Sequence, residues 1–156
     1  MEMFGWTGNA LLVNLTSEYV KRVTIPQWIL ENFMGGRGLG AKILYDNLDP
    51  KIDPFHEDNI LIFSVGPLTA TRVYTSGRYT IISKSPLTNG IFYSSAGGFF
   101  GASLKKAGLD AIIIKGRARN PVYLYIDDED VRIENASHLW GKGTREVREI
   151  IRRDMG

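Results

Sequence analysis

Apolar and polar positions in the first fifty residues predict a hairpin followed by two helices. Asn9–Leu15 (NALLVNL) has the composition of a strand, and the approximate alternation over Val20–Ile25 predicts a second strand after a short turn. Pro26 suits the first turn of a helix that continues over Gln27–Met34 and is expected to end at a pair of glycines. A second helix is expected over about Leu39–Leu48, where leucine and isoleucine recur on one face.

The rest of the chain alternates strands and helices at irregular intervals. The apolar run Asn59–Val65 (NILIFSV) predicts a strand buried on both faces. After it we expect strands over Tyr79–Ser83, Ile91–Ser94 and Ala111–Lys115, a helix over Phe99–Ala107 with Gly108 as its C-terminal cap, a hairpin of Val122–Ile126 and Asp130–Ile133, and a last helix over Arg145–Met155 capped by Thr144. This order predicts an α+β fold with helices packed on sheets, and it is too irregular for a doubly wound nucleotide-binding fold. The last helix has no evident stop before the chain end, which favours a piece of a longer polypeptide.

A repeated glycine pattern favours an internal duplication. Gly35-Gly36 precedes Gly40-Ala41, and Gly97-Gly98 precedes Gly101-Ala102 in the same way. Each glycine pair is expected to open a helix, and each helix to lead into a buried strand. Chance similarity is the alternative, since the 17 glycines exceed the roughly 11 that average usage gives a chain of this length.

Length and charge narrow the classes of function. A chain of 156 residues fits one domain, and 44% hydrophobic residues are enough for a core. The near balance of 19 Lys and Arg against 17 Asp and Glu argues against a nucleic-acid partner, for which a basic excess is typical. No apolar run approaches the roughly 20 residues that span a membrane, and the N-terminus lacks a signal-peptide pattern, so we expect a cytoplasmic protein.

The sequence offers few residues for metal binding or acid–base chemistry. It contains no cysteine, so it supplies no disulfide, thiolate metal site or iron–sulfur ligand. His56 and His138 are far apart and lack a nearby ligand partner, and we interpret both as structural. The acidic run Asp127–Asp130 is interpreted as a solvated hairpin tip, because it lacks the alternating ligands of a calcium loop, and Lys84–Thr88 as a polar bend.

Three segments could bind an anion. Gly35–Gly40 (GGRGLG) is similar in letters to a dinucleotide-binding loop, but a helix is expected before it, so we interpret it as a helix–helix junction that needs positive φ and close backbone approach. Ser94–Gly98 (SSAGG) joins a strand to a helix N-terminus, which favours a phosphate, with a tight packing turn as the alternative. Arg78 follows a flexible turn and could hold a phosphate or carboxylate, or tune a redox centre, although most single arginines are solvated or paired.

Longer strings carry a resemblance to a known family. Residues Ser76–Ala118 (SGRYTIISKSPLTNGIFYSSAGGFFGASLKKAGLDAIIIKGRA) resemble the most characteristic stretch of the N-terminal domain of aldehyde:ferredoxin oxidoreductases. The resemblance continues through Gly8–Leu15, the string GGRGLGAKIL, VGPLT at Val65–Thr69 and ASHLWGK at Ala136–Lys142. It covers nearly the whole chain, and the combination is specific although no single piece is.

The resemblance implies a cofactor-cradling domain. Members of the family oxidise aldehydes to carboxylic acids and pass the electrons to ferredoxin. Tungsten, or in some relatives molybdenum, is held by two pterin dithiolenes beside a [4Fe-4S] cluster, and the N-terminal domain is a base of sheets for this bis-pterin cofactor. The cluster ligands come from later helical domains of the same polypeptide, which are absent from this chain. We therefore expect residues 1–156 alone to have no oxidoreductase activity.

Three residues of this chain match family positions at the cofactor. Arg78 matches an arginine between cofactor and cluster, and Gly97 matches a glycine whose backbone meets the cofactor. Ser95 stands where the best-known members have an asparagine that helps to hold the pterin phosphates through a magnesium ion. Serine offers one hydroxyl instead of an amide, so it could bond a phosphate directly or through water.

Three other functions are compatible with the sequence. A relative within the superfamily could act on an aromatic acyl thioester or a carboxylic acid, because this domain binds cofactor and not substrate. A stand-alone pterin-binding or maturation subunit is a second alternative, and a small α+β interaction domain a third. The exposed cofactor face also allows self-association into a homo-oligomer.

Overall fold

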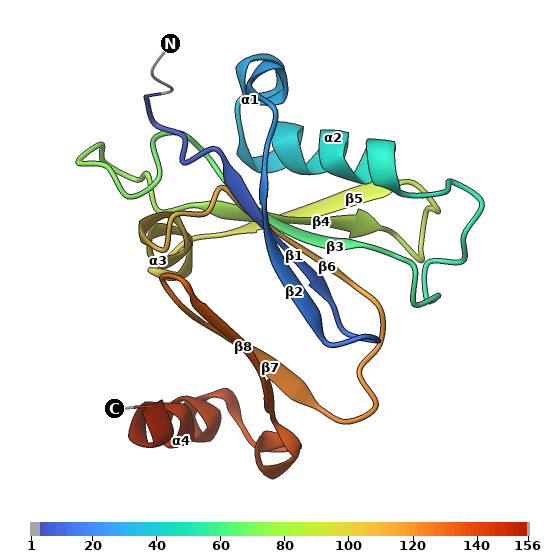
Figure 1. The fold of residues 1–156 in the computed structure, drawn as a ribbon, viewed down its shortest axis with the longest axis vertical. Coiled ribbons are helices and arrows are strands. Elements are labelled where there is room, and N and C mark those ends of the chain that lie inside the picture. Colours follow the sequence, from blue (N-terminus) through green and yellow to red (C-terminus); the bar gives the residue numbers. More distant parts are fainter. Residues whose placement is uncertain (1–3, 156) are drawn as a thin grey trace.

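The computed structural model describes residues 4–155 as one large and one small sheet with four helices (Figure 1). The strands are β1 (Asn9–Asn14), β2 (Tyr19–Thr24), β3 (Leu61–Val65), β4 (Tyr79–Lys84), β5 (Ile91–Ala96), β6 (Ala111–Lys115), β7 (Val122–Asp127) and β8 (Asp130–Asn135). The helices are α1 (Gln27–Phe33), α2 (Gly36–Asn47), α3 (Phe100–Lys106) and α4 (Thr144–Met155), with a short 3-10 turn at Ser137–Leu139. The predicted α+β class is confirmed.

The large sheet has six strands in the order β2-β1-β6-β3-β4-β5. Only β1 and β6 are parallel, and every other neighbouring pair is antiparallel. A doubly wound fold needs a mainly parallel sheet, so this topology agrees with its exclusion from the sequence. The two edge strands are β2 and β5.

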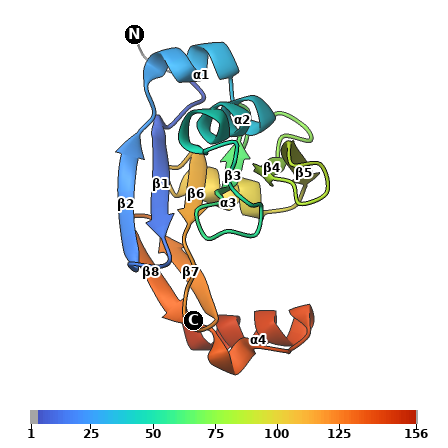
Figure 2. The ribbon, with the colours of Figure 1, turned by 90° about the vertical axis from the view of Figure 1, so that its right-hand side faces the viewer.

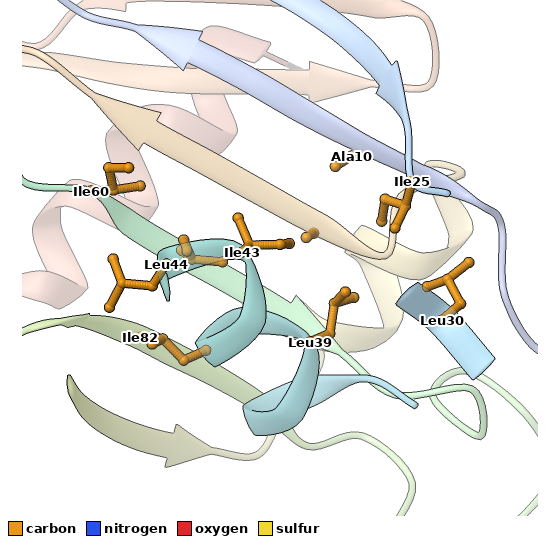
Figure 3. Packing of buried hydrophobic residues seen from close by; sticks show 10 residues of the cluster. Ala10, Ile25, Leu30, Leu39, Ile43, Leu44, Ile60 and Ile82 are labelled. Carbon is orange, nitrogen blue, oxygen red and sulfur yellow. The ribbon is translucent and has the colours of Figure 1, made fainter. Parts of the chain in front are cut away.

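The large sheet is covered on both faces, but unevenly. One face packs against α1 and α2, and Figure 3 shows Leu30, Leu39, Ile43 and Leu44 of these helices directed at the sheet, where Ile82 lies. On the other face, α3 and the β7–β8 hairpin cover a second cluster of buried side chains: Leu11, Val13, Val65, Leu104, Leu109 and Ile112. Burial of these side chains is the main stabilising term of the fold.

The β7–β8 hairpin forms a separate two-stranded sheet beneath β1 and β2 (Figure 2). Arg22 of β2 ties the two sheets together, because its guanidinium lies 3.2 Å from the Glu129 carboxylate and donates to the main-chain oxygens of Ala107 and Asp128. The acidic turn of the hairpin is therefore partly engaged by a cation rather than wholly solvated.

The start of the second helix was predicted wrongly. Helix α2 begins at Gly36, not at Leu39. Gly35 (φ 154°) and Gly36 (φ 51°) make a turn so tight that the next residues are already helical. Gly40 lies against the core, because a Cβ atom there would stand 2.2 Å from Cδ1 of Ile82. The interpretation of this segment as a helix–helix junction is confirmed.

Two smaller expectations need correction. Strand β3 begins at Leu61, because the Asn59 side chain bonds main-chain atoms of Pro54, Lys84 and Ile60 and turns the chain before it. Leu61 is 38% exposed, so the strand is not buried on both faces along its whole length. Thr144 is the first residue of α4 rather than its cap.

Both glycine pairs precede helices, but not in the same way: Gly36 is the first residue of α2, whereas Gly98 lies two residues before the start of α3 at Phe100. Helix α2 leads to β3 and α3 leads to β6, and β3 and β6 are neighbours in the sheet. The helices lie on opposite faces of that sheet (Figure 1). The duplication itself stays a hypothesis. Among residues 4–155, no helix is both long and apolar enough to cross a membrane.

Candidate functional site

The register of the β4–β5 hairpin brings the three predicted site residues together. Tyr79 pairs with Ala96 and Thr80 with Ser95, so Arg78 and Gly97 follow directly beyond the last pair. Alternate residues of a strand point to the same face. Ser95 and Thr80 therefore share the face that carries α2, and Arg78 and Gly97 continue it.

Strand β5 leaves this surface open. It is the last strand of the sheet, and all six of its residues are exposed. It runs to Ala96, two residues further than predicted, and so carries Ser95 within the ladder. Natural proteins usually protect their edge strands, so the exposure of β5 within residues 4–155 is unusual.

A small open cavity lies at the end of the hairpin. It has a volume of about 240 Å³ and is lined by Thr75, Gly77, Arg78, Gly97 and Gly98. A Cβ atom added at Gly97 would meet no atom within 4 Å, so packing inside residues 4–155 does not require glycine there. Gly98 has φ 97°, which favours glycine for backbone reasons instead.

Close backbone contacts fix the shape of this cavity. A Cβ atom at Gly77 would lie 3.0 Å from the main-chain oxygen of Gly98, and one at Gly101 would lie 3.0 Å from that of Gly77. The glycines thus let the turn before β4 pack on the start of α3. The loop joins a strand to a helix as predicted, although α3 begins at Phe100 and is only seven residues long.

Ser95 has a protein partner for its hydroxyl. Its Oγ lies 3.2 Å from Oγ1 of Thr80, and either oxygen could be the donor. Thr80 is buried, and a Cβ atom at Gly36 would lie 3.6 Å from its Oγ1. The pair therefore connects the first turn of α2 to the exposed strand.

The structure adds Arg37 to this surface, a residue that sequence reasoning missed. Its Nη1 donates to the Tyr93 hydroxyl at 2.7 Å, and its guanidinium carbon lies 4.7 Å from the centre of the Tyr93 ring. The signal was present in GGRGLG, but only the fold shows that the arginine reaches β5, 56 positions further along the chain.

Charge at the site is positive and uncompensated. Within residues 4–155, neither Arg37 nor Arg78 forms an ion pair with a carboxylate. Both side chains are exposed. A surface with two arginines, a hydroxyl pair and glycine backbone is suited to phosphate oxygens.

The remaining sequence candidates lie outside this site. His56 stands 3.3 Å from Asp58 and His138 3.8 Å from Asp154, each at the surface. Lys84 is buried and donates to the main-chain oxygens of Pro50 and Ile52, both at 2.6 Å, so it braces the loop after α2. In the part of the chain that the structure describes, no group of three or more His, Cys, Asp or Glu side chains is arranged to hold a metal ion.

A separate groove of about 710 Å³ lies beside α1 and α2. Apolar side chains such as Leu12, Val23 and Ile113 line much of it, and it contains none of the site residues. Its two lysines, Lys51 and Lys115, share the walls with the carboxylates of Asp49 and Asp58, which would repel a phosphate, so we place the candidate site at the hairpin instead.

Comparison with known proteins decides the family. Residues 10–156 match the family described as "Aldehyde ferredoxin oxidoreductase, N-terminal domain". The chain belongs to the aldehyde ferredoxin oxidoreductase family. The resemblance carried by the SGRY, SSAGG and GGRGLG strings is thereby confirmed.

Relatives in the aldehyde ferredoxin oxidoreductase family are similar over almost the whole chain. A tungsten-containing aldehyde ferredoxin oxidoreductase of Pyrococcus abyssi is 49% identical over 154 residues, which cover 99% of this chain and 25% of the relative. An aliphatic sulfonate oxidoreductase, WOR-like subunit, of Pyrococcus furiosus is 40% identical over 98% of this chain and 25% of its own length. The chain thus spans about a quarter of the length of these relatives.

A solved structure shares this family domain's fold. The active site complex BamBC of benzoyl coenzyme A reductase, in complex with 1,5-dienoyl-CoA, superposes with a TM-score of 0.94 at 40% identity. The match covers 97% of this chain and 23% of the other. The fold of the aldehyde ferredoxin oxidoreductase N-terminal domain therefore occurs in proteins named for different substrates.

Proposed function

We propose that this chain is the cofactor-cradling N-terminal domain of a longer oxidoreductase that converts aldehydes to carboxylic acids and passes electrons to ferredoxin. The family and the names of its relatives support this proposal. The observation that carries it is the meeting of Arg78, Ser95 and Gly97 on one open surface of the β4–β5 hairpin.

The residues present fit the phosphate end of a bis-pterin. Arg78 has no carboxylate partner within residues 4–155 and can give a two-pronged set of donors to phosphate oxygens. The free space at Gly97 allows an approach to the backbone that a methyl group would obstruct. If the Ser95 hydroxyl accepts the bond from Thr80, it keeps its proton for a phosphate oxygen; if it donates, its lone pairs remain for a water or a magnesium-bound water.

The redox chemistry is assigned to groups that this chain only supports. When bound, tungsten or molybdenum in the bis-pterin would supply the two-electron oxidation, and a [4Fe-4S] cluster would carry the electrons onward. The sequence has no cysteine, so we assign the cluster ligands to C-terminal domains of the same polypeptide. The task of residues 1–156 is to bind and orient the cofactor, to position a fixed positive charge at Arg78, and to exclude water.

The proposal is tested on the full-length protein, purified without oxygen. We expect tungsten or molybdenum together with iron and pterin, and aldehyde oxidation with ferredoxin or a dye as electron acceptor. Purified residues 1–156, assayed under the same conditions, are expected to be inactive. A metal-free full-length protein, or aldehyde oxidation by residues 1–156 alone, would overturn the proposal.

A second function is favoured by two of the relatives. One is named as an aliphatic sulfonate oxidoreductase subunit and another as part of a benzoyl coenzyme A reductase. Because this domain contacts cofactor and not substrate, the same site would serve an enzyme for a sulfonate or an aromatic acyl thioester. A panel of aldehydes, alkyl sulfonates and aromatic thioesters, assayed with one enzyme preparation, separates these cases.

Assembly and location follow from the same proposal. Several large apolar side chains are exposed on and next to β5, among them Phe92 (56%) and Phe99 (90%). We propose that later domains of the polypeptide cover them, with a homo-oligomer as the alternative and the cytoplasm as the location. A concentration-independent monomer of the full-length protein in sedimentation would exclude the homo-oligomer.

A further inference from the structure

Arg37 is held in a fixed orientation by Tyr93 and has no carboxylate partner within residues 4–155. Its guanidinium lies over the Tyr93 ring and uses one N–H for the Tyr93 hydroxyl. A guanidinium has five N–H donors, so about four remain for another acceptor. Stacking on an aromatic ring restricts the side chain and lowers the entropy lost when a ligand binds.

The position of Arg37 links it to the candidate site. Tyr93 precedes Ser95 by two residues on β5, so both point to the α2 face and lie about 7 Å apart along the strand. On the helix side, Gly36 lies above Thr80, whose Oγ1 is 3.2 Å from Oγ of Ser95. Helix α2 runs along this part of the sheet in Figure 1. Arg37 thus flanks Ser95 on one side, and Arg78 flanks it on the other.

We propose that Arg37 is a second phosphate-binding residue of this site and that Tyr93 is its positioning residue. The inference rests on the proposed function, since the phosphate is that of the bound pterin. A phosphate group carries more than one negative charge and has several acceptor oxygens. A single arginine neutralises only part of this charge and donates to only some of the oxygens. Two arginines on either side of a hydroxyl complete a set of donors that Arg78 alone does not provide.

The test compares variants of the full-length, cofactor-loaded protein. Arg37→Ala, Arg37→Lys and Tyr93→Phe are prepared beside Arg119→Ala, a matched control on the exposed loop between β6 and β7. The rate at which pterin and its tungsten or molybdenum leave the protein is measured at low and high salt, with circular dichroism to verify folding. Cofactor retention, and not activity, is therefore the readout.

The expected order follows from the contacts. Arg37→Ala loses pterin roughly tenfold faster than the parent, as expected when a charge-assisted hydrogen bond to phosphate is lost. Arg37→Lys recovers part of the retention, because lysine keeps the charge but lacks the planar pair of N–H donors of a guanidinium. The rate of pterin loss from Tyr93→Phe falls between those of the parent and Arg37→Ala. Arg119→Ala behaves as the parent does.

Three results would overturn the inference. If Arg37→Ala retains pterin as long as Arg119→Ala, Arg37 does not bind the phosphate, although the proposed function stands. Should Arg37→Ala fail to fold, Arg37→Gln takes its place, and parental retention in that variant contradicts the proposal. A parent protein without pterin would instead overturn the proposed function, and this inference with it.

Discussion

The glycine pairs near the starts of α2 and α3 have different structural roles. At the start of α2, Gly35 is enclosed: a Cβ atom there would lie 2.7 Å from the main-chain oxygen of Val65. At the loop before α3, a Cβ atom on Gly97 or Gly98 would meet nothing within 4 Å. Glycine is therefore required by close packing at Gly35, whereas Gly97 and Gly98 border free space.

This contrast separates folding from binding within one motif. Glycine at position 35 is explained by its neighbours, because any side chain there would collide with the backbone of β3 or with the turn after it, and Gly36 is explained by its φ of 51°. Glycine at Gly97 is not explained by any neighbour in residues 4–155, and its backbone φ is not positive. The unexplained glycine is the one that lies beside Arg78 and Ser95, where we propose that a cofactor approaches.

The largest effect is expected for Gly35→Ala. The variant combines a close contact with Val65 and a backbone angle that side chains rarely adopt, so we expect a loss of roughly 3 kcal/mol of unfolding free energy. Urea unfolding of the full-length protein measures it. Gly143→Ala, where a Cβ atom also meets nothing within 4 Å, is the control for the same chemical change. Equal unfolding free energies of Gly35→Ala and Gly143→Ala would contradict the claim that close packing requires glycine at position 35.

Arg78→Ala is expected to have the next largest effect, on function and not on stability. Loss of a charge-assisted bond to the cofactor should lower activity and bound pterin by about tenfold. Because Arg78 is exposed and forms no ion pair among residues 4–155, the unfolding free energy should change by less than about 0.5 kcal/mol. Parallel losses of melting temperature and activity would point to a structural role.

Gly97→Ala sharpens the comparison directly. The added methyl group has free space in residues 4–155, so stability should stay within about 0.5 kcal/mol of the parent. Pterin content of the full-length protein should nevertheless fall several-fold, because the methyl group occupies the space proposed for the cofactor. Pterin content equal to that of Gly143→Ala would mean that Gly97 faces no ligand.

Ser95→Ala should have the smallest effect. It removes a hydroxyl that forms a hydrogen bond with Thr80, and losing such a bond typically lowers the unfolding free energy by about 1 kcal/mol or less. Ser95→Asn introduces the amide that the best-known family members carry, and it should keep pterin at least as well as the parent does. Titration of magnesium during cofactor release distinguishes a direct phosphate bond from one through the ion.

Most of the fold could be predicted because local patterns decide it. The hairpin of β1 and β2, the strand β6 and the β7–β8 hairpin follow from apolar runs between turn residues. The early start of α2 was missed because a glycine pair usually ends a helix without opening the next one within a single residue. The exposure of Leu61 depends on which parts of the sheet the helices cover, which a run of apolar letters does not contain.

The site was predictable only in part. Resemblance gave Arg78, Ser95 and Gly97, and the register of β4 with β5 supplies the physical reason why these residues meet. Arg37 could not be found in this way, since its contact with Tyr93 depends on how α2 crosses the sheet. Contacts between residues far apart in sequence are the part of a site that periodicity and motif spacing leave undetermined.

The most direct test is a crystal structure of the full-length protein with its cofactor. The central claim predicts pterin phosphate oxygens within hydrogen-bonding distance of the surface formed by Arg78, Ser95 and Gly97, with the free space at Gly97 filled by cofactor atoms or its bound water. Phosphates held entirely by other elements, with Arg78 paired to a carboxylate of a later domain, would contradict it.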